Sequence, residues 1–169
     1  MKTNNIMRDS IYKKLISIYF FIVTKLRRNR RPERIMGTFN ISMYDFCTRL
    51  NLMPYRYDYL HGLLDSVADP DTFFDEKDHG RDCDDFARMW SWWLTINDYE
   101  AVEYCVANPD RLFSTLHMIT IGHKNDEYWL MNYYYYGPFK SEQEALDYMR
   151  KFNSYKNNMI YVRTPVKFK

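Results

Sequence analysis

Apolar residues near the N-terminus recur at the spacing of an α-helix. The positions that carry this pattern are Ile11, Leu15, Ile18, Ile22 and Leu26. Their intervals of three and four residues predict one helix from Arg8 to Arg31. The most apolar part, Leu15 to Val23, is nine residues long, whereas a membrane span needs about 20. The pattern therefore predicts a helix that does not cross a membrane.

Basic residues dominate the end of this helix and the segment after it. They are Lys25, Arg27, Arg28, Arg30, Arg31 and Arg34. Three roles fit: a helix docked on the domain or on a partner, a membrane-surface anchor, and a nucleic-acid contact. The net charge of +2 is too small to indicate a specific nucleic acid. We expect no cleavable signal peptide and a cytoplasmic location, that of the host cell for a viral protein.

Caps and apolar spacing predict several helices further along the chain. Ser42 begins one that runs to about Leu52, and a second is expected from Tyr57 to Val67. The capping box Ser141-x-x-Glu144 opens another, which runs to about Phe152. An acidic loop at residues 69–80 precedes the clearest helix of the chain.

That clearest helix covers Asp82 to about Asn97. Asp82 is a suitable N-cap, and Asp85 stands at the third helical position, where its carboxylate can return the capping hydrogen bond. Cys83 lies three positions before Phe86, on the same face of the helix. The sequence therefore places a thiol in the first turn of a long helix.

Alternating apolar residues predict strands in the second half of the chain. The expected strands are Ala101–Ala107, Thr115–Gly122, Glu127–Tyr135 and Met159–Thr164. Helices first and strands later indicate an α+β fold. We expect residues 1–33 to form an amphipathic basic helix, an arm or an anchor, and residues 34–169 to form a single domain.

Composition narrows the function further. With five glycines among 169 residues, Gly-rich phosphate loops are nearly excluded. The frequent Lys, Asn, Ile and Tyr are typical of AT-rich coding, as in a phage, a virus or a low-GC bacterium. Three cysteines give no disulfide framework, which indicates free thiols in a reducing compartment. Cys47 and Cys105 have apolar neighbours and should be buried, whereas Cys83 sits among charged residues.

Cys83 has the position of a nucleophile. Backbone N–H groups in the first turn of a helix can stabilise a thiolate and the oxyanion formed later. The neighbouring carboxylates of Asp82, Asp84 and Asp85 act in the opposite sense and should raise the thiol pKa. A reactive thiolate would therefore depend on a nearby imidazolium more than on the helix dipole.

His117 is the expected base, and Asn132 the residue that orients it. If Lys124 and Asn125 form the tip of a hairpin, residues whose numbers sum to 249 face one another. Ile121 then meets Tyr128, Ile119 meets Leu130, and His117 meets Asn132. Opposed side chains have Cβ atoms about 4.5–5.5 Å apart. Cys83, His117 and Asn132 would then form a nucleophile–base–orienter triad.

Two sequence elements resemble those of the transglutaminase-like superfamily, in its bacterial and phage cysteine-peptidase branch. The segment Gly80-Arg81-Asp82-Cys83-Asp84-Asp85-Phe86-Ala87 resembles its G-D-C-D-D-[FY]-A element, with Arg81 as one extra residue. Leu116-His117-Met118 and Tyr128-Trp129-Leu130-Met131-Asn132 resemble its H-x-[VI] and W-x-x-[DN] strands. The resemblance covers about residues 70–135.

The resemblance implies a papain-like fold in which the cysteine opens a helix packed on an antiparallel sheet. It also implies thiol-dependent chemistry on peptide or protein amides, as a cysteine peptidase (a hydrolase, or thiol protease) or as a transglutaminase. No cofactor is implied, although some transglutaminases use calcium. Asn132 stands where the family usually has Asp, and the only Gln, Gln143, lies downstream of the cysteine, where it cannot match the oxyanion-hole Gln of papain-like enzymes.

A catalytically inactive scaffold or interaction protein of the same fold is the alternative function. A metal site is not predicted, because His79, Asp82, Cys83 and Asp84 lack the spacing of known zinc motifs. Trp90 and Tyr134 are candidates for substrate contact, although core packing explains Trp90 equally well.

Overall fold

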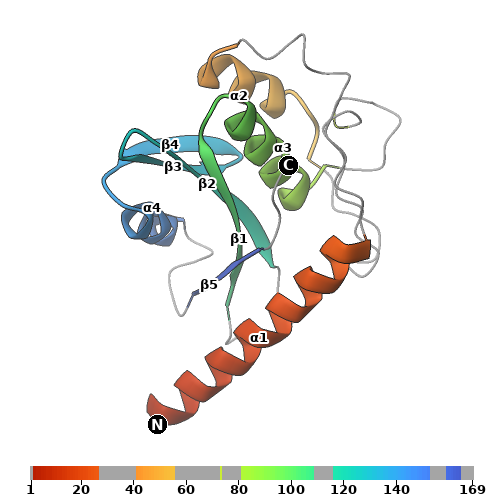
Figure 1. The fold of residues 1–169 in the computed structure, drawn as a ribbon, viewed down its shortest axis with the longest axis vertical. Coiled ribbons are helices and arrows are strands. Elements are labelled where there is room, and N and C mark those ends of the chain that lie inside the picture. Colours follow the sequence, from red (N-terminus) through yellow and green to blue (C-terminus); the bar gives the residue numbers. More distant parts are fainter. Residues whose placement is uncertain are drawn as a thin grey trace.

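Among the described residues, α-helices precede the first strand, and a further helical segment lies between the last two strands (Figure 1). The computed structural model describes residues 2–26, 41–55, 73, 81–108, 116–152 and 159–164, with the side chains of residues 6–19 in the first helix. The described elements are α1 (Lys2–Leu26), α2 (Met43–Asn51), α3 (Cys83–Ile96), β1 (Glu100–Ala107), β2 (His117–Lys124), β3 (Glu127–Asn132), β4 (Tyr134–Phe139), α4 (Glu142–Tyr148), the 3₁₀-helix η1 (Met149–Lys151) and β5 (Ile160–Arg163).

The five described strands form one open sheet in the order β4-β3-β2-β1-β5. Every neighbouring pair is antiparallel. The predicted α+β class is confirmed, and so are strands close to the expected positions of β1, β2 and β5. The expected helix Tyr57–Val67, the acidic loop and His79 lie outside the described residues.

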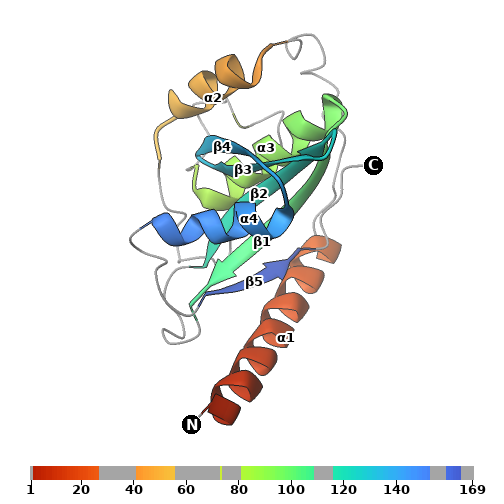
Figure 2. The same ribbon diagram turned by 90° about the vertical axis from the view of Figure 1, so that its left-hand side faces the viewer.

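Helices cover both faces of the sheet. Figures 1 and 2 show α4 on one face and α3 on the other, with α2 beyond α3. On the α4 side, Ile119, Ile121 and Leu130 pack with Ala145 and Leu146. On the α3 side the core is largely aromatic, with Phe46, Phe73, Phe86, Trp90, Trp92 and Trp93 among its buried members. The sheet thus separates two apolar clusters.

Side-chain caps begin the helices as predicted. Ser42 accepts a hydrogen bond from the Asp45 backbone N–H at 3.1 Å, and Ser141 accepts one from Glu144 at the same distance. At α3 the capping box is complete, because the Asp85 carboxylate accepts from the Asp82 N–H at 3.2 Å. These caps satisfy backbone donors that have no partner inside the helix.

The third predicted strand, Glu127–Tyr135, is wrong at its end. β3 stops at Asn132, and Tyr133 turns the chain with a φ of +60°. The chain then runs back as the edge strand β4, in which Tyr134 pairs with Asn132. A positive φ is uncommon for a residue with a Cβ atom, so the run of four tyrosines gave no turn signal.

The predicted register of the β2–β3 hairpin is also wrong, by two residues. The tip is Asn125-Asp126, with φ values of 53° and 61°, and Lys124 pairs with Glu127. Two central residues with positive φ are the requirement of a type I′ turn, which Asn and Asp adopt readily. A shift of two residues keeps each side chain on its face, so the predicted faces are preserved.

The long helix α1 docks on the sheet at β5. It begins at Lys2, earlier than predicted, and its described part ends at Leu26. Ile16 is buried in a cluster with Cys105, Met118 and Val162, and Tyr12 and Cys83 pack against the same cluster. Within the part of the chain that the structure describes, no helix combines the length and apolarity needed to cross a membrane.

Candidate active site

The start of α3 lies beside the start of β2. Cys83 is the first residue of α3 and is half-buried, and its Sγ lies 3.9 Å from the backbone oxygen of Leu116. Leu116 directly precedes His117, the first residue of β2. The helix therefore holds the thiol against the chain segment that leads into the predicted base.

His117 and Asn132 form the polar pair that the sequence predicts. The Nε2 atom of His117 lies 2.7 Å from Oδ1 of Asn132, and both side chains are buried. An amide oxygen only accepts hydrogen bonds, so Nε2 carries the proton in this contact. In the neutral ring, Nδ1 then holds the lone pair that can take up a proton.

The thiol-bearing helix packs on the sheet face opposite to Ile119 and Ile121. Its contacts are with the even-numbered residues of β2: the Thr120 hydroxyl donates to the Ala87 carbonyl at 2.7 Å, and Gly122 lies under Leu94. By alternation, His117 starts on the α4 side. His117 is the first residue of β2, so it lies at the end of the sheet, close enough to the start of α3 to feel the charge of Asp82.

Tyr133 links the imidazole to α3. Its ring centroid lies 5.7 Å from that of His117 and 5.2 Å from that of Phe86 in α3. The positive φ that ends β3 turns this ring toward both partners. Tyr133 was not among the predicted site residues. The available signal was its position directly after Asn132.

Burial sets the protonation state of His117. Loss of water around the ring lowers the pKa of His117 below its ordinary value of 6.5. The hydrogen bond to Asn132 and the negative charge of Asp82 raise this pKa and oppose the effect of burial. The ring is therefore neutral near pH 7, which is the form that a general base needs.

The carboxylates of Asp82, Asp84 and Asp85 gather at the start of α3, with ligand atoms within 4.8 Å of one another. Their contacts are those of helix capping. Asp82 accepts from the Asp84 N–H at 3.3 Å, Asp84 from the Asp85 N–H at 3.1 Å, and Asp85 from the Asp82 N–H at 3.2 Å. The cap roles predicted for Asp82 and Asp85 are confirmed, and the cluster needs no metal ion to explain it.

Capping also limits the supply of oxyanion donors. The Asp84 and Asp85 N–H groups were among the first-turn donors expected to stabilise an oxyanion, and both already donate to carboxylates. A donor for an oxyanion would therefore be a group other than these two. Arg81 is buried, and its Nε donates to the Phe73 carbonyl.

Trp90 lies in the core. Its side chain is 0 % exposed and packs edge-on against Phe46, with centroids 5.1 Å apart, and near Trp93 and Tyr135. The predicted substrate contact of Trp90 is therefore corrected to a packing role. Tyr134 is 56 % exposed on β4, and substrate contact there stays a prediction.

The other two cysteines are buried, as predicted. Burial raises the pKa of Cys47, and it raises the pKa of Cys105 to about 12. Both stay protonated at neutral pH and unreactive toward electrophiles. Cys83 is the described cysteine with a partly exposed side chain.

The motif segments named in the sequence, residues 80–87, 116–118 and 128–132, contribute the start of α3, the start of β2 and all of β3 except Glu127 within the described residues. Comparisons of the chain with protein-family models, with curated proteins and with solved structures found no match.

Proposed function

We propose that this protein transfers acyl groups from amide bonds through a Cys83–His117–Asn132 triad on a papain-like or transglutaminase-like fold. The observation that carries the proposal is the buried 2.7 Å hydrogen bond between His117 and Asn132. It fixes a neutral imidazole at the strand end against which the thiol-bearing helix begins. A buried, oriented base beside a helix-terminal cysteine is the arrangement of activated thiol nucleophiles.

In the first step, the Cys83 Sγ bonds to the carbonyl carbon of the substrate while Nδ1 of His117 takes the thiol proton. The tetrahedral intermediate collapses, the C–N bond breaks, and the imidazolium returns the proton to the leaving amine. The product is a thioester between the acyl group and Cys83. Asn132 holds the ring through Nε2 during both proton transfers.

The thioester then reacts with a second nucleophile. Water gives a carboxylic acid, which is the outcome for a peptidase or amidase, and a primary amine gives a new amide, which is the outcome for a transglutaminase. His117 deprotonates either nucleophile, and the proton passes back to the Cys83 sulfur. We infer a peptide or protein amide as the substrate class, and Tyr134 as an exposed aromatic residue available for its contact.

A catalytically inactive scaffold is the second candidate. Three carboxylates within 4.8 Å of one another lie beside Cys83, and negative charge disfavours a thiolate. The third triad position also carries an amide, which cannot stabilise an imidazolium by charge. In this case the fold would bind a partner without forming a thioester.

Acylation by an activated ester separates the two candidates. p-Nitrophenyl acetate should transfer one acetyl group to the wild-type chain, seen by intact mass and mapped to Cys83. Cys83→Ala should abolish the adduct, whereas Cys47→Ala, which removes a buried thiol, should not. Addition of a primary alkylamine then shows whether the acyl group passes to amine or to water. A wild-type chain that acquires no adduct on Cys83 would support the scaffold.

A further inference from the structure

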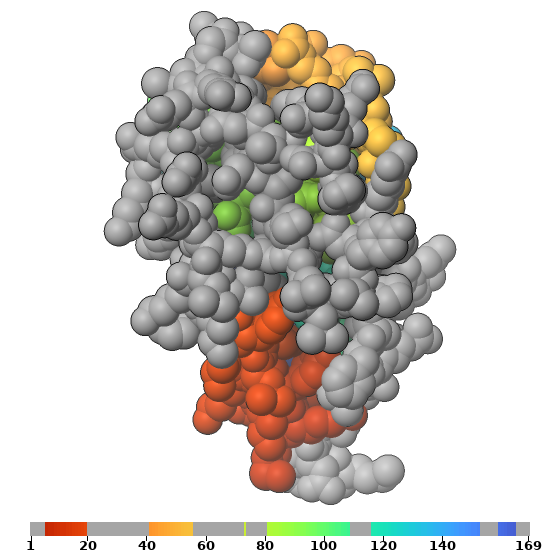
Figure 3. Space-filling view, turned by 90° about the vertical axis from the view of Figure 1, so that its right-hand side faces the viewer, coloured from red at the N-terminus to blue at the C-terminus, as the bar shows by residue number. Residues whose placement is uncertain are grey.

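One side of α1 carries a continuous apolar stripe, formed by Met7, Ile11, Leu15 and Ile18. These four side chains are between 52 % and 65 % exposed, at intervals of four, four and three residues. Helical spacing of about 100° per residue places them on one face, about 145° on average from the buried Ile16 that docks the helix on the sheet. Figure 3 shows residues 6–19 of α1 on the surface of the molecule.

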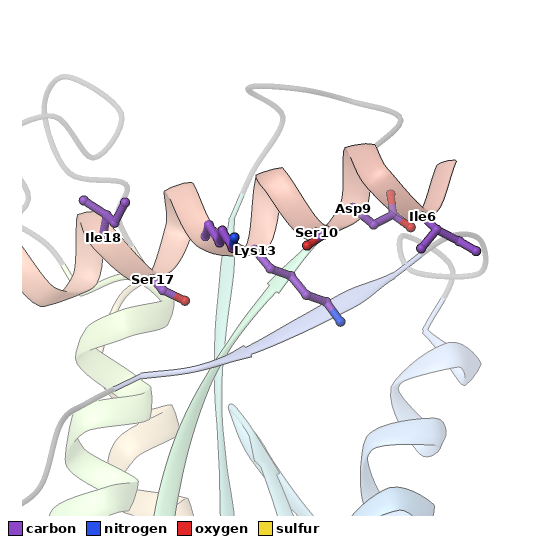
Figure 4. A pocket seen from close by; sticks show the side chains of 7 residues that line it. Ile6, Asp9, Ser10, Lys13, Ser17 and Ile18 are labelled. Carbon is purple, nitrogen blue, oxygen red and sulfur yellow. The ribbon is translucent and has the colours of Figure 1, made fainter. Parts of the chain in front are cut away.

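A hollow with a mainly apolar lining, which also includes the carboxylate of Asp9, lies beside the stripe. Its volume is about 660 Å³, and the described residues that line it belong to α1. Figure 4 shows the labelled lining residues spaced along the helix, among them Ser10, Lys13 and Ser17; Lys14 also lines the hollow. Hydroxyl and ammonium donors thus lie next to exposed aliphatic side chains. This combination suits a ligand with an anionic head and an apolar body.

The formal charge is unevenly distributed along the chain. Residues 1–34, which include α1, are basic, and the remaining residues are acidic. Residues 1–34 hold ten Lys and Arg against two Asp and Glu, a formal charge of +8. Residues 35–169 hold fourteen Lys and Arg against twenty Asp and Glu, a formal charge of −6. The segment that carries the apolar stripe is therefore attracted to anionic surfaces although the chain is nearly neutral.

We propose that the stripe of α1 binds an anionic lipid surface, with the helix lying in the interface. Met7, Ile11, Leu15 and Ile18 would enter the acyl boundary while Lys14, which flanks the stripe, contacts headgroups. Nucleic acid would neutralise the basic residues but offers little to four aliphatic side chains. A second copy of the chain would bring two segments of charge +8 together. Lipid is the occupant that satisfies both the apolar and the basic features.

Vesicle binding tests this proposal on the full chain. Vesicles of phosphatidylcholine with phosphatidylserine should bind the protein at least tenfold more tightly than phosphatidylcholine alone. Raising NaCl from about 0.1 M to about 0.5 M should weaken binding, because the attraction is screened. The double variant Ile11→Gln/Leu15→Gln should reduce binding to the anionic vesicles at least tenfold. Both positions are exposed, so circular dichroism should show an unchanged fold.

A matched control removes apolar groups elsewhere. Tyr44→Gln/Leu52→Gln changes two exposed residues of α2 and its C-cap, at the far end of the molecule from α1 (Figures 1 and 2). Its vesicle binding should stay within twofold of wild type. The proposal is overturned if Ile11→Gln/Leu15→Gln binds as well as wild type or if the chain binds duplex DNA but not the vesicles. A dimer that this variant dissociates would overturn it as well.

Discussion

The Nε2 atom of His117 lies 2.7 Å from Oδ1 of Asn132, although the two residues are not directly opposed in the sheet. Thr120 pairs with Met131, so the same register continued by one residue sets Ile119 opposite Asn132 and His117 on the diagonal. Diagonal neighbours have Cβ atoms within about 7–8 Å, a distance that a histidine and an asparagine side chain can span together. The hydrogen bond therefore requires two side chains that are long enough to meet across the diagonal.

Removing the Asn132 amide should make His117 less effective in activating Cys83. Asn132→Ala should slow alkylation of Cys83 by iodoacetamide at pH 7 about tenfold, the effect of a hydrogen bond worth about 1.4 kcal/mol. Asn132→Asp should raise the pKa of His117, because a carboxylate stabilises the imidazolium. Asn125→Gly, at the hairpin tip, should leave both quantities unchanged. An Asn132→Ala rate within twofold of wild type would contradict the orienting role.

Asp82 should contribute charge to the base as well as a cap to α3. Its negative charge raises the pKa of His117, so Asp82→Asn should lower that pKa further. Asn is as good an N-cap as Asp, so the helix should be retained. The measurement is a proton NMR titration of the His117 ring, assigned with His117→Asn. Asp98→Asn, at an exposed position with positive φ, is the control. Equal changes in the His117 pKa in the two variants would show that the charge of Asp82 does not act on His117.

The lowered pKa of His117 predicts a loss of stability in acid. Below its ordinary pKa of 6.5 the unfolded chain binds a proton that the folded chain resists. The contribution of a neutral His117 is therefore complete above pH 6.5 and declines as pH falls below it. Urea unfolding at pH 7.5, 6.5 and 5.5 should show a smaller decline for His117→Gln than for wild type. Parallel declines would show that His117 titrates normally.

Local signals in the sequence predicted the helix starts correctly. Ser42, Asp82 and Ser141 are caps whose hydrogen bonds depend only on residues within one turn. The His117–Asn132 contact was also predicted, even though the assumed register was wrong. A two-residue shift in register keeps every side chain on the same face of the sheet. Asn132 is therefore the diagonal neighbour of His117 and not the residue directly opposite it.

Features that depend on tertiary packing were not predictable in this way. The turn is made by Tyr133, a residue type that gives no turn signal, so alternation alone extended the predicted strand and hid the edge strand β4. Trp90 shares a helix with the candidate nucleophile, and its periodicity fits a groove and a core equally well. Only the aromatic cluster on the α3 face decides for the core.

A buried ion pair joins α3 to β1 and should be strongly coupled. Arg88 Nε lies 3.0 Å from Glu103 Oε1, with side chains 12 % and 2 % exposed. Arg88→Met should destabilise the fold by about 3–5 kcal/mol, because the Glu103 charge stays buried. Arg88→Met/Glu103→Leu should recover most of this loss, since neither charge remains. Urea unfolding of the single and double variants measures the coupling. Additive losses would show that the pair is not coupled.

The central claim is that His117 activates Cys83. The most direct measurement is the pH dependence of iodoacetamide alkylation, mapped by mass spectrometry, for wild type, Cys83→Ala and His117→Ala. We predict that Cys83 reacts faster at pH 6–7 than a free thiol of pKa about 8.5 allows, and that Cys47 and Cys105 stay unlabelled. His117→Ala should slow the reaction at least tenfold at pH 7. A Cys83 that titrates near pH 8.5 in wild type and in His117→Ala alike would contradict the account.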